Sequence, residues 1–340
     1  MKVKKITSET SYVLNKVSPR LNSSAVVGLM AAYTESDRRR HRYCFHQNPD
    51  VSLHDIVIVY DEKSYIPPNK HIGKSESLLV LNGCLDFFIF SDDGRVIEYR
   101  RLGSIGTQYP FYVRVPPNTW HGLRAVGSDP CIIKETISGP YDRSTLLWGD
   151  FAPNEAVGVD EGARWYDEVS RKCRVNSIVQ PADEVFERVS DTLFRSSRQL
   201  LTVGRAQLEP IVAASHRSPL RRARLLCHMG PEDKLQEMFI SLAAGVDIEE
   251  SVHIRKDESL TVVSGNAEYV FPNEDGSVRD VAPLGPYDSE MCSDDFFFAR
   301  INRFVPHKIV VPENEIVIHE ATTGPFIKED TAYRLKWIDQ

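Results

Sequence analysis

Hydrophobic residues along this chain fall in short alternating runs that are separated by turn residues. Residues 78–81 and 84–90 form two such runs around Asn82-Gly83, a spacing typical of a β-hairpin with a two-residue turn. The segment Ser91-Asp92-Asp93-Gly94 predicts the next turn. Many short strands with Pro and Gly between them predict a mainly β fold, either a sandwich or a jelly roll. Further strands are expected at 56–60, 112–115 and 131–137.

The same pattern occurs twice along the chain, which predicts a tandem duplication. The offset is 253 − 71 = 182 at first, and a small indel changes it to 307 − 121 = 186 downstream. We therefore expect two homologous domains, over residues 1–172 and 173–340. The equivalent pairs include His71 and His253, Glu76 and Glu258, Gly83 and Gly265, His121 and His307, Arg42 and Arg224, and His46 and His228.

Helical periodicity is confined to short flanking segments. It is visible near 12–17 and 183–193, at the start of each half, and over 154–169. The longest uncharged apolar stretch, around 25–33, is too short to cross a bilayer, so we expect no membrane segment. The Lys-rich start is followed by polar residues rather than by an apolar signal-peptide core, which predicts a cytoplasmic protein.

Composition narrows the functional class. Hydrophobic residues make up 41% of the chain and charged residues 26%, which fits a folded globular protein and excludes a disordered one. Lys+Arg 41 against Asp+Glu 48 gives a net charge of −7, which argues against a polybasic surface for nucleic acid. The six cysteines contain no CxxC pair, so we expect them to be reduced.

Each half carries two histidines and one glutamate at spacings suited to a metal site. Two His and a carboxylate that converge inside a small barrel leave coordination positions open for water or substrate. The expected cofactor is a divalent metal (Fe, Mn, Zn or Ni), and the alternative is a barrel whose histidines only form hydrogen bonds. The predicted ligands are His71, Glu76 and His121 in the first half and His253, Glu258 and His307 in the second.

The spacing Asn69-x-His71-x4-Glu76-x6-Gly83, followed by a Pro-rich turn before His121, resembles the two cupin motifs. The resemblance implies two tandem cupin domains, each a double-stranded β-helix or jelly roll. Asn69 and Ser251 stand where a four-ligand cupin has its first His. Because an Asn carbonyl oxygen is a better ligand than a Ser hydroxyl, we expect the first half to hold metal more tightly.

Further segments resemble the WbuC family of cupin-fold metalloproteins. They are the Trp120-His121 dipeptide, the segment 135–141 that ends in Gly-Pro-Tyr, the Phe151-Ala152-Pro153 tripeptide and the segment 222–228. The resemblance implies a link to bacterial O-antigen and capsule gene clusters and a fused tandem of two such domains. The chain departs from the family at Asn69 and Ser251, and at Cys44 and Leu226, where the family has Asn.

Strand alternation predicts further polar side chains inside each barrel. Glu135 and Glu320 each share a strand face with apolar residues, which favours a raised pKa and general acid or base work; pairing with a nearby arginine is the alternative. Arg42 with His46, and Arg224 with His228, share strand faces that would meet an anionic ligand, unless these arginines are solvated surface charge. The predicted catalytic residues are Glu135, His46, Glu320 and His228, and the predicted substrate-binding residues are Arg42, Arg224, Asn69, Trp120 and Tyr141.

Three functional hypotheses follow from these residues, and the resemblance to WbuC proteins supplies the pathway named in the first. The first is a metal-binding bicupin that binds or modifies a sugar or sugar nucleotide in surface-polysaccharide biosynthesis, in the manner of an epimerase or isomerase. The second is an Fe(II)-dependent dioxygenase, because two His and one carboxylate with open positions suit that chemistry. The third is a non-catalytic carbohydrate-binding protein. An exposed sheet edge would also allow a homodimer.

Overall fold

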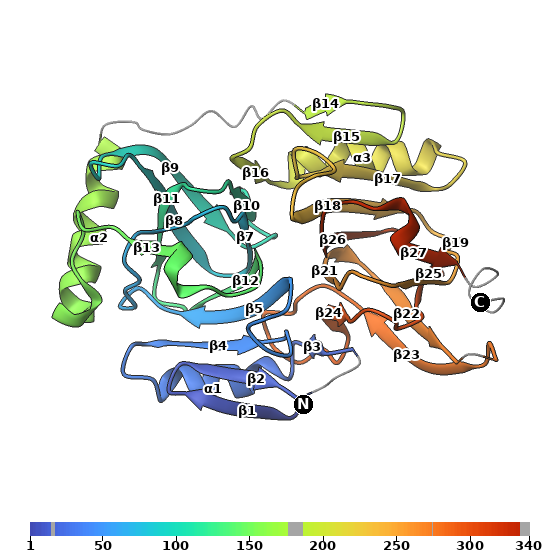
Figure 1. Cartoon of the computed structure of the whole chain (residues 1–340), viewed down its shortest axis with the longest axis horizontal. Helices are drawn as coiled ribbons and strands as arrows, with labels where there is room; N and C mark the ends of the chain where they lie inside the picture. Colours follow the sequence, from blue (N-terminus) through green and yellow to red (C-terminus); the bar gives the residue numbers. More distant parts are fainter. Residues whose placement is uncertain (15–17, 176–185, 274, 334–340) are drawn as a thin grey trace.

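In the computed structural model, which describes residues 1–14, 18–175, 186–273 and 275–333, two β-barrels lie side by side (Figure 1). The mainly β prediction with tandem domains and flanking helices is confirmed. The strands of the first half are β1 (Val3–Thr7), β2 (Thr10–Val13), β3 (Arg20–Asn22), β4 (Arg40–Cys44), β5 (Leu53–Tyr60), β6 (Asn69–His71), β7 (Glu76–Asn82), β8 (Cys84–Phe90), β9 (Val96–Gly103), β10 (Tyr112–Val115), β11 (Trp120–Val126), β12 (Cys131–Ser138) and β13 (Leu146–Trp148).

The second half repeats this order of strands and adds one short strand, β19. Its strands are β14 (Phe186–Arg188), β15 (Leu193–Ser196), β16 (Leu201–Val203), β17 (Arg222–Leu226), β18 (Leu235–Leu242), β19 (Val246–Asp247), β20 (Ser251–His253), β21 (Glu258–Gly265), β22 (Ala267–Pro272), β23 (Val278–Leu284), β24 (Phe296–Ile301), β25 (Lys308–Val311), β26 (Ile316–Thr323) and β27 (Thr331–Tyr333).

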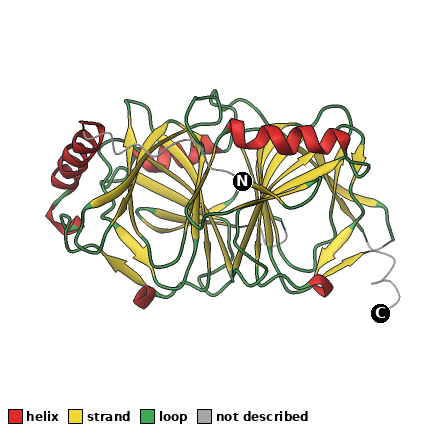
Figure 2. Cartoon of the chain, turned by 90° about the horizontal axis from the view of Figure 1, so that it is seen from above, coloured by secondary structure: helices red, strands yellow, loops and turns green. Residues whose placement is uncertain are grey.

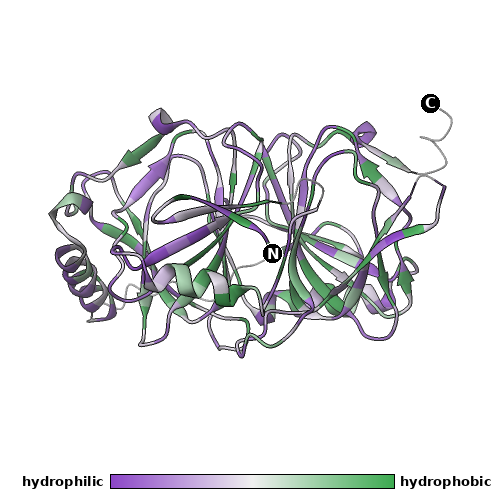
Figure 3. Ribbon diagram, turned by 90° about the horizontal axis from the view of Figure 1, so that it is seen from below, coloured by the Kyte–Doolittle hydropathy of each residue, from purple (hydrophilic) through white to green (hydrophobic). Residues whose placement is uncertain are grey.

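The helices lie at the periphery, as Figure 2 shows. They are α1 (Val26–Thr34), α2 (Val159–Val175) and α3 (Arg205–Arg217), with short 3-10 turns at Arg143–Thr145, Glu155–Val157 and Lys328–Asp330. Helix α2 is largely hydrophilic in Figure 3, whereas the barrel strands carry most of the hydrophobic colour. No helix within the described ranges is both long and apolar enough to span a bilayer.

Two of the three predicted helices are wrong. Residues 10–13 form β2, and 186–188 form β14; residues 15–17 and 183–185 lie outside the described ranges. Both segments pair with neighbouring strands at a sheet edge, and this pairing overrides their helical periodicity. The prediction over 154–169 agrees broadly with α2. Helix α1 instead forms from the apolar stretch 25–33, because Val26, Leu29 and Tyr33 form a buried stripe at helical spacing.

The Asn82-Gly83 hairpin is also wrong, because β7 and β8 belong to different sheets. β7 lies between β12 and β10, whereas β8 lies between β11 and β9. The chain therefore passes from one wall of the barrel to the other at Gly83. This residue has φ 80°, and a Cβ there would lie 3.1 Å from the Cα of Cys131, so both its conformation and its surroundings favour glycine. The 91–94 turn does join two antiparallel strands, β8 and β9.

Equivalent strands are exchanged between the halves. β3 of the first half pairs with β24 of the second, and β16 of the second half pairs with β10 of the first. The exchanged strands are related by the repeat, since 203 − 21 = 182. One apolar cluster accordingly contains Leu21 and Tyr112 together with Phe239 and Phe298. The two halves therefore share a continuous core, and the predicted join at residue 173 falls inside α2.

A buried ionic network also spans the contact between the halves and has approximate two-fold symmetry. In one arm, the carboxylate of Asp55 accepts hydrogen bonds from Arg300 at 2.5 Å and Ser259 at 2.7 Å and lies 2.9 Å from the Lys134 ammonium. In the other arm, Glu237 contacts Arg114 and Ser77 and lies 3.4 Å from Nε2 of His319. Both carboxylates are completely buried, so each depends on groups contributed by the other half.

Candidate metal centre

The first predicted triad is assembled by three strands of the first barrel. His71 ends β6, Glu76 begins β7, and His121 lies on β11 directly opposite Asn69. Their ligand atoms all lie within 4.8 Å of one another. Because β6 and β11 are neighbours, the two imidazoles face the same side of one sheet and meet the glutamate from the other sheet. The predicted ligands of the first half are thus brought together.

The carboxylate of Glu76 lies between the two imidazoles without being satisfied by them. Its Oε2 atom is 3.0 Å from Nε2 of His71 and 3.5 Å from Nε2 of His121. It is nevertheless a buried acceptor with no hydrogen bond of normal geometry in the described part of the chain. Nδ1 of His121 donates to the carbonyl oxygen of Thr119 at 3.0 Å, which leaves Nε2 free to act as a ligand.

The electrostatics of this triad suit a cation. Burial alone would raise the pKa of Glu76, but the imidazoles of His121 and His71 hold it well below the usual range. Burial tends to lower the pKa of His121, yet the charge of Glu76 outweighs this and raises it. An ionised, unsatisfied carboxylate between two imidazole nitrogens is a donor set that fits a divalent metal.

The second predicted triad occupies the equivalent place in the second barrel. Nε2 of His253 lies 2.8 Å from Oε2 of Glu258, and Nε2 of His307 lies 3.8 Å from Oε1. Nδ1 of His307 donates to the carbonyl oxygen of Val305 at 2.8 Å. The ligand atoms again lie within 4.8 Å of one another. Here, however, the hydroxyl of Tyr269 also donates to Oε1 of Glu258, at 3.0 Å.

Each triad has a second glutamate nearby, as the strand alternation predicts. Glu135 lies on β12 on the same face as the buried Cys131 and Ile133. Burial and the charge of Glu76 raise its pKa to about 7, although Arg42 and the two histidines oppose the shift. Burial and Glu258 likewise raise the pKa of Glu320 to about 7. Both carboxyls therefore titrate near neutral pH, which suits a general acid or base.

Arg42 lies inside the first barrel beside Glu135. It pairs with Ile58 across β4 and β5, and Ile58 belongs to the apolar lining. Its guanidinium has no hydrogen bond or ion pair within the described residues, and its charge acts on Glu135, Tyr12 and Cys44. A half-buried cation without a partner leaves its donors available to an anionic ligand. Arg224 takes the equivalent position, where its charge opposes the rise in the pKa of Glu320 that burial and Glu258 cause.

His46 and His228 are buried among groups at the contact between the halves. The ring of His46 stacks on His54 at 4.1 Å, and its Nδ1 lies 3.3 Å from the carbonyl oxygen of Asp55. Burial, with His54 and Arg300, lowers its pKa to about 3, so it is neutral at physiological pH. Nδ1 of His228 lies 2.8 Å from the carbonyl oxygen of Glu237, and burial lowers its pKa. Neither contacts a triad residue through these bonds.

The three other predicted binding residues lie in different surroundings. Asn69 shares the face of His71, and its side-chain amide donates to the carbonyl oxygen of Pro67 at 3.4 Å. Trp120 points to the opposite face of β11 from His121: its indole N–H donates to Asp92, and its ring packs on Phe151. That position outside the barrel does not support the predicted role of Trp120 in substrate binding. Tyr141 is 54% exposed beyond the end of β12.

Several residues that shape the two sites are not among those predicted from the sequence. Tyr60 and Tyr12 line the first barrel, and the Tyr60 hydroxyl is buried with no hydrogen-bond partner among the described residues. Tyr269 and Thr331 contact the second triad. Tyr269 could have been identified from the repeat, because it lies 182 residues after Phe87, its equivalent in the first half. Each of these two rings packs against the downstream histidine of its own half.

Comparison with known families supports the duplication. Residues 21–102 and 203–284 each match the model described as a domain of unknown function (DUF6016). The two matched stretches are separated by 203 − 21 = 182 residues, the offset of the repeat. No curated protein matches the chain.

Solved structures show the fold over the full chain. Salicylate 1,2-dioxygenase from Pseudaminobacter salicylatoxidans is similar with a TM-score of 0.61 and 12% identity, covering 99% of this chain and 91% of that one. A mutant of the same enzyme in complex with gentisate is similar with a TM-score of 0.59 and 12% identity, covering 98% and 88%. With the repeated barrels and their His and Glu clusters, this similarity identifies the chain as a protein of tandem cupin fold.

Proposed function

We propose that the first half is a metal-dependent enzyme that acts on a small organic anion, and that its leading activity is epimerisation or isomerisation of a sugar or sugar nucleotide. The unsatisfied Oε2 of Glu76 between His71 and His121 carries the proposal, because a buried anionic acceptor without a donor requires a cation to offset its desolvation. A divalent metal held by His71, Glu76 and His121 meets that requirement. When bound, it supplies Lewis-acid polarisation of a substrate oxygen.

Arg42 and Glu135 supply the other two functions that such a reaction needs. The guanidinium of Arg42 would orient a phosphate or a carboxylate of the substrate through charge-assisted hydrogen bonds. In its ionised form, Glu135 would accept a proton from a carbon next to a carbonyl group, and the electron pair would move onto the carbonyl oxygen. In an α-hydroxy carbonyl substrate, the hydroxyl proton would then move to the former carbonyl oxygen. Return of the first proton from Glu135 to the former carbonyl carbon would form the new carbonyl group at the other carbon, so the step gives an isomer, restores the carboxylate and consumes no other reactant.

The link to surface polysaccharides depends on the resemblance to WbuC proteins, which stays a prediction. It suggests uronates, sugar phosphates and nucleotide sugars as the first compounds to test. All three carry the negative charge that Arg42 suits.

A second candidate function is an Fe(II)-dependent dioxygenase. The two His and one Glu leave open coordination positions, which this chemistry also needs. The similarity in fold to salicylate 1,2-dioxygenase along the whole chain supports it. The apolar lining of the first barrel, which includes Ile56, Ile58 and Phe87, suits an aromatic acid whose carboxylate meets Arg42.

Two assays on one protein sample distinguish these candidates. Incubation of anionic sugars with metal-loaded protein in D2O should incorporate deuterium at carbon, observed by NMR, if Glu135 moves a proton. Oxygen consumption on aromatic acids that depends on added Fe(II) would instead identify the dioxygenase. In either case His71→Ala should abolish turnover and His253→Ala should retain it. Turnover that survives His71→Ala would overturn the proposed site.

A further inference from the structure

The two triads differ in the groups that surround them, although their ligands are equivalent. In the second half, the hydroxyl of Thr331 lies 3.2 Å from Nδ1 of His253, whose Nε2 lies 2.8 Å from Glu258. The hydroxyl of Tyr269 donates to the other oxygen of Glu258 at 3.0 Å. These four side chains form one continuous hydrogen-bond chain. Both oxygens of the Glu258 carboxylate are occupied within it.

This hydrogen-bond chain places the proton of the His253 imidazole on Nε2, which opposes metal binding at that nitrogen. The ionised carboxylate of Glu258 can only accept, so Nε2 of His253 must be the donor in the 2.8 Å bond. Nδ1 is then the acceptor of a hydrogen bond that the Thr331 hydroxyl donates. A metal can bind the imidazole only after Nε2 loses its proton and the chain is broken.

The first half lacks both hydroxyl groups that end this hydrogen-bond chain. β13 pairs with β6 as β27 pairs with β20, and this register places Leu146 beside His71 where Thr331 lies beside His253. Phe87 lies where the second half has Tyr269. Neither Leu146 nor Phe87 offers a hydroxyl. Consequently Glu76 keeps an unsatisfied oxygen, whereas Glu258 does not.

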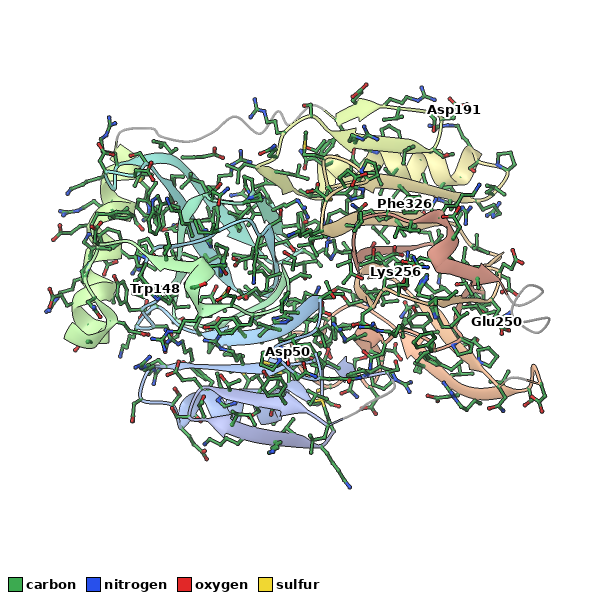
Figure 4. All side chains as sticks on the ribbon, viewed as in Figure 1. Asp50, Trp148, Asp191, Glu250, Lys256 and Phe326 are labelled. Atoms are coloured by element: carbon green, nitrogen blue, oxygen red, sulfur yellow. The ribbon has the colours of Figure 1, made fainter. Side chains whose placement is uncertain are left out.

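A lysine near the second triad also opposes metal binding. Lys256, labelled on the second half in Figure 4, is partly buried two residues before Glu258. The Lys256 ammonium is close enough to Glu258 for its positive charge to act on that carboxylate, as His253 and His307 also do. In the first half the equivalent Lys74 donates instead to the carbonyl oxygen of Pro140, at the end of β12. A fixed positive charge near Glu258 disfavours a divalent cation there.

We propose that Thr331, Tyr269 and Lys256 keep the second triad free of metal, so that each chain holds a single catalytic metal ion at His71, Glu76 and His121. Hydrogen bonds and the ammonium satisfy Glu258 in place of an ion. The second barrel then has a structural role, contributing β16 and Arg300 to the first half. The proposal relies on the proposed function only for the claim that the first triad binds metal.

Exchange of the end groups between the halves tests this proposal. Metal-free protein is titrated with Mn(II), free Mn(II) is followed by electron paramagnetic resonance, and bound metal is measured by elemental analysis. The native chain should bind one ion. The variant Tyr269→Phe/Thr331→Leu gives the second triad the surroundings of the first and should bind two ions. The variant Phe87→Tyr/Leu146→Thr should bind its single ion at least roughly tenfold more weakly, because new hydrogen bonds compete for Glu76 and His71.

Matched lysine variants separate the effect of the Lys256 charge from the effect of the hydrogen bonds. Lys256→Met should strengthen Mn(II) binding at the second triad, while Lys74→Met should leave the titration unchanged. These single variants also serve if the double variant of the second half fails to fold, as judged by its melting temperature. Binding of two ions by the native chain, one of them lost in His253→Ala, would overturn the inference. A native chain that binds no ion would instead overturn the proposed function, while the second-half variant would still test the inference by gaining an ion.

Discussion

The two barrels keep the same three metal-ligating residues, but their interiors have diverged in opposite directions. In the first half the barrel interior carries Tyr12, Cys44 and Tyr60 around Arg42. The repeat places Leu226 and Leu242 at the positions equivalent to Cys44 and Tyr60. Phe194, the equivalent of Tyr12, packs instead against the core that the two halves share. The first interior thus contains polar groups that a ligand can meet, whereas the second has replaced them with apolar side chains and satisfied its glutamate internally.

The two interiors also differ in their buried polar groups that lack a hydrogen-bond partner. A buried polar group without a partner destabilises a fold by about 1–3 kcal/mol. Among the described residues around its triad and Arg42, the interior of the first barrel retains such groups in the hydroxyl of Tyr60 and Oε2 of Glu76. Proteins retain costs of this kind mainly at functional sites. At the corresponding places the second barrel has Leu242 and a carboxylate bonded to Tyr269. These differences support the proposal that the first half is the active one.

Substitution of the two interior glutamates should give the largest difference between the halves, measured as the rate of deuterium incorporation. Glu135→Gln removes the proton acceptor, so deuterium incorporation should fall about 10²- to 10⁴-fold, the contribution of a positioned acid or base. Glu320→Gln is the matched control and should change the rate little. Because the pKa of Glu135 is about 7, the native rate should rise with pH through neutrality as the carboxyl ionises. Equal losses in the two variants would refute the assignment of activity to one half.

The two arms of the buried network differ in their cations, which gives the next largest effect. Asp55 faces both Arg300 and Lys134, whereas Glu237 faces Arg114 and a histidine. Burial lowers the pKa of His319, so it is neutral at pH 7. Arg114→Met leaves a buried anion without a strong cation and should lower the free energy of unfolding by about 3–5 kcal/mol.

Denaturation in urea measures this loss. Lys134→Met is the matched variant in the other arm, and its cost should be smaller because Asp55 keeps Arg300. Adding Glu237→Gln to Arg114→Met should recover much of the stability, since it removes the uncompensated charge. A larger loss in Lys134→Met than in Arg114→Met would contradict this account of the two arms.

Acid should weaken the contact between the halves. Burial alone would raise the pKa of Asp55, but Lys134 and Arg300 lower it to about 2. Arg114 and His319 likewise lower the pKa of Glu237 to about 2 against the effect of burial. Their stabilisation is complete above the ordinary carboxyl pKa and is lost as pH falls from about 4 toward 2, at about 2–3 kcal/mol for each group. Urea midpoints at pH 7, 4 and 3 measure it, and Glu237→Gln should show a smaller decrease with pH than the native chain.

The features that the sequence predicted well are those that local spacing determines. The His and Glu positions follow from motifs that place them on adjacent strands, and the duplication made each motif visible twice. Glu135 follows from alternation along a single strand. Trp120 was misplaced because adjacent residues on a strand point to opposite faces, so a ring next to His121 must face away from the triad.

Other features depend on contacts between distant segments. The exchange of β3 and β16 and the pairing of Asp55 with Arg300 arise only when the two halves pack. The Asn82-Gly83 pair predicted a hairpin because a local turn signal does not reveal which sheet receives the next strand. The repeat nevertheless contained part of the answer, since Asp55 and Glu237 are 182 residues apart, as are Ser77 and Ser259.

The smallest effect is expected for the two interior arginines, whose substitution compares ligand binding in the two halves. Arg42→Ala removes charge-assisted hydrogen bonds to an anionic ligand without opening a cavity in the core, so binding should weaken roughly tenfold, about 1.5 kcal/mol. The melting temperature should change little, because the guanidinium makes no hydrogen bond or ion pair in the described part of the chain. Arg224→Ala, the matched variant, should leave binding unchanged, because the second half has Leu226 and Leu242 where the first half has Cys44 and Tyr60. Calorimetric titration with a sugar phosphate and with an aromatic carboxylate measures both variants. A large fall in melting temperature with unchanged binding in Arg42→Ala would assign this arginine to the fold, and a loss of binding confined to Arg224→Ala would move the ligand to the second barrel.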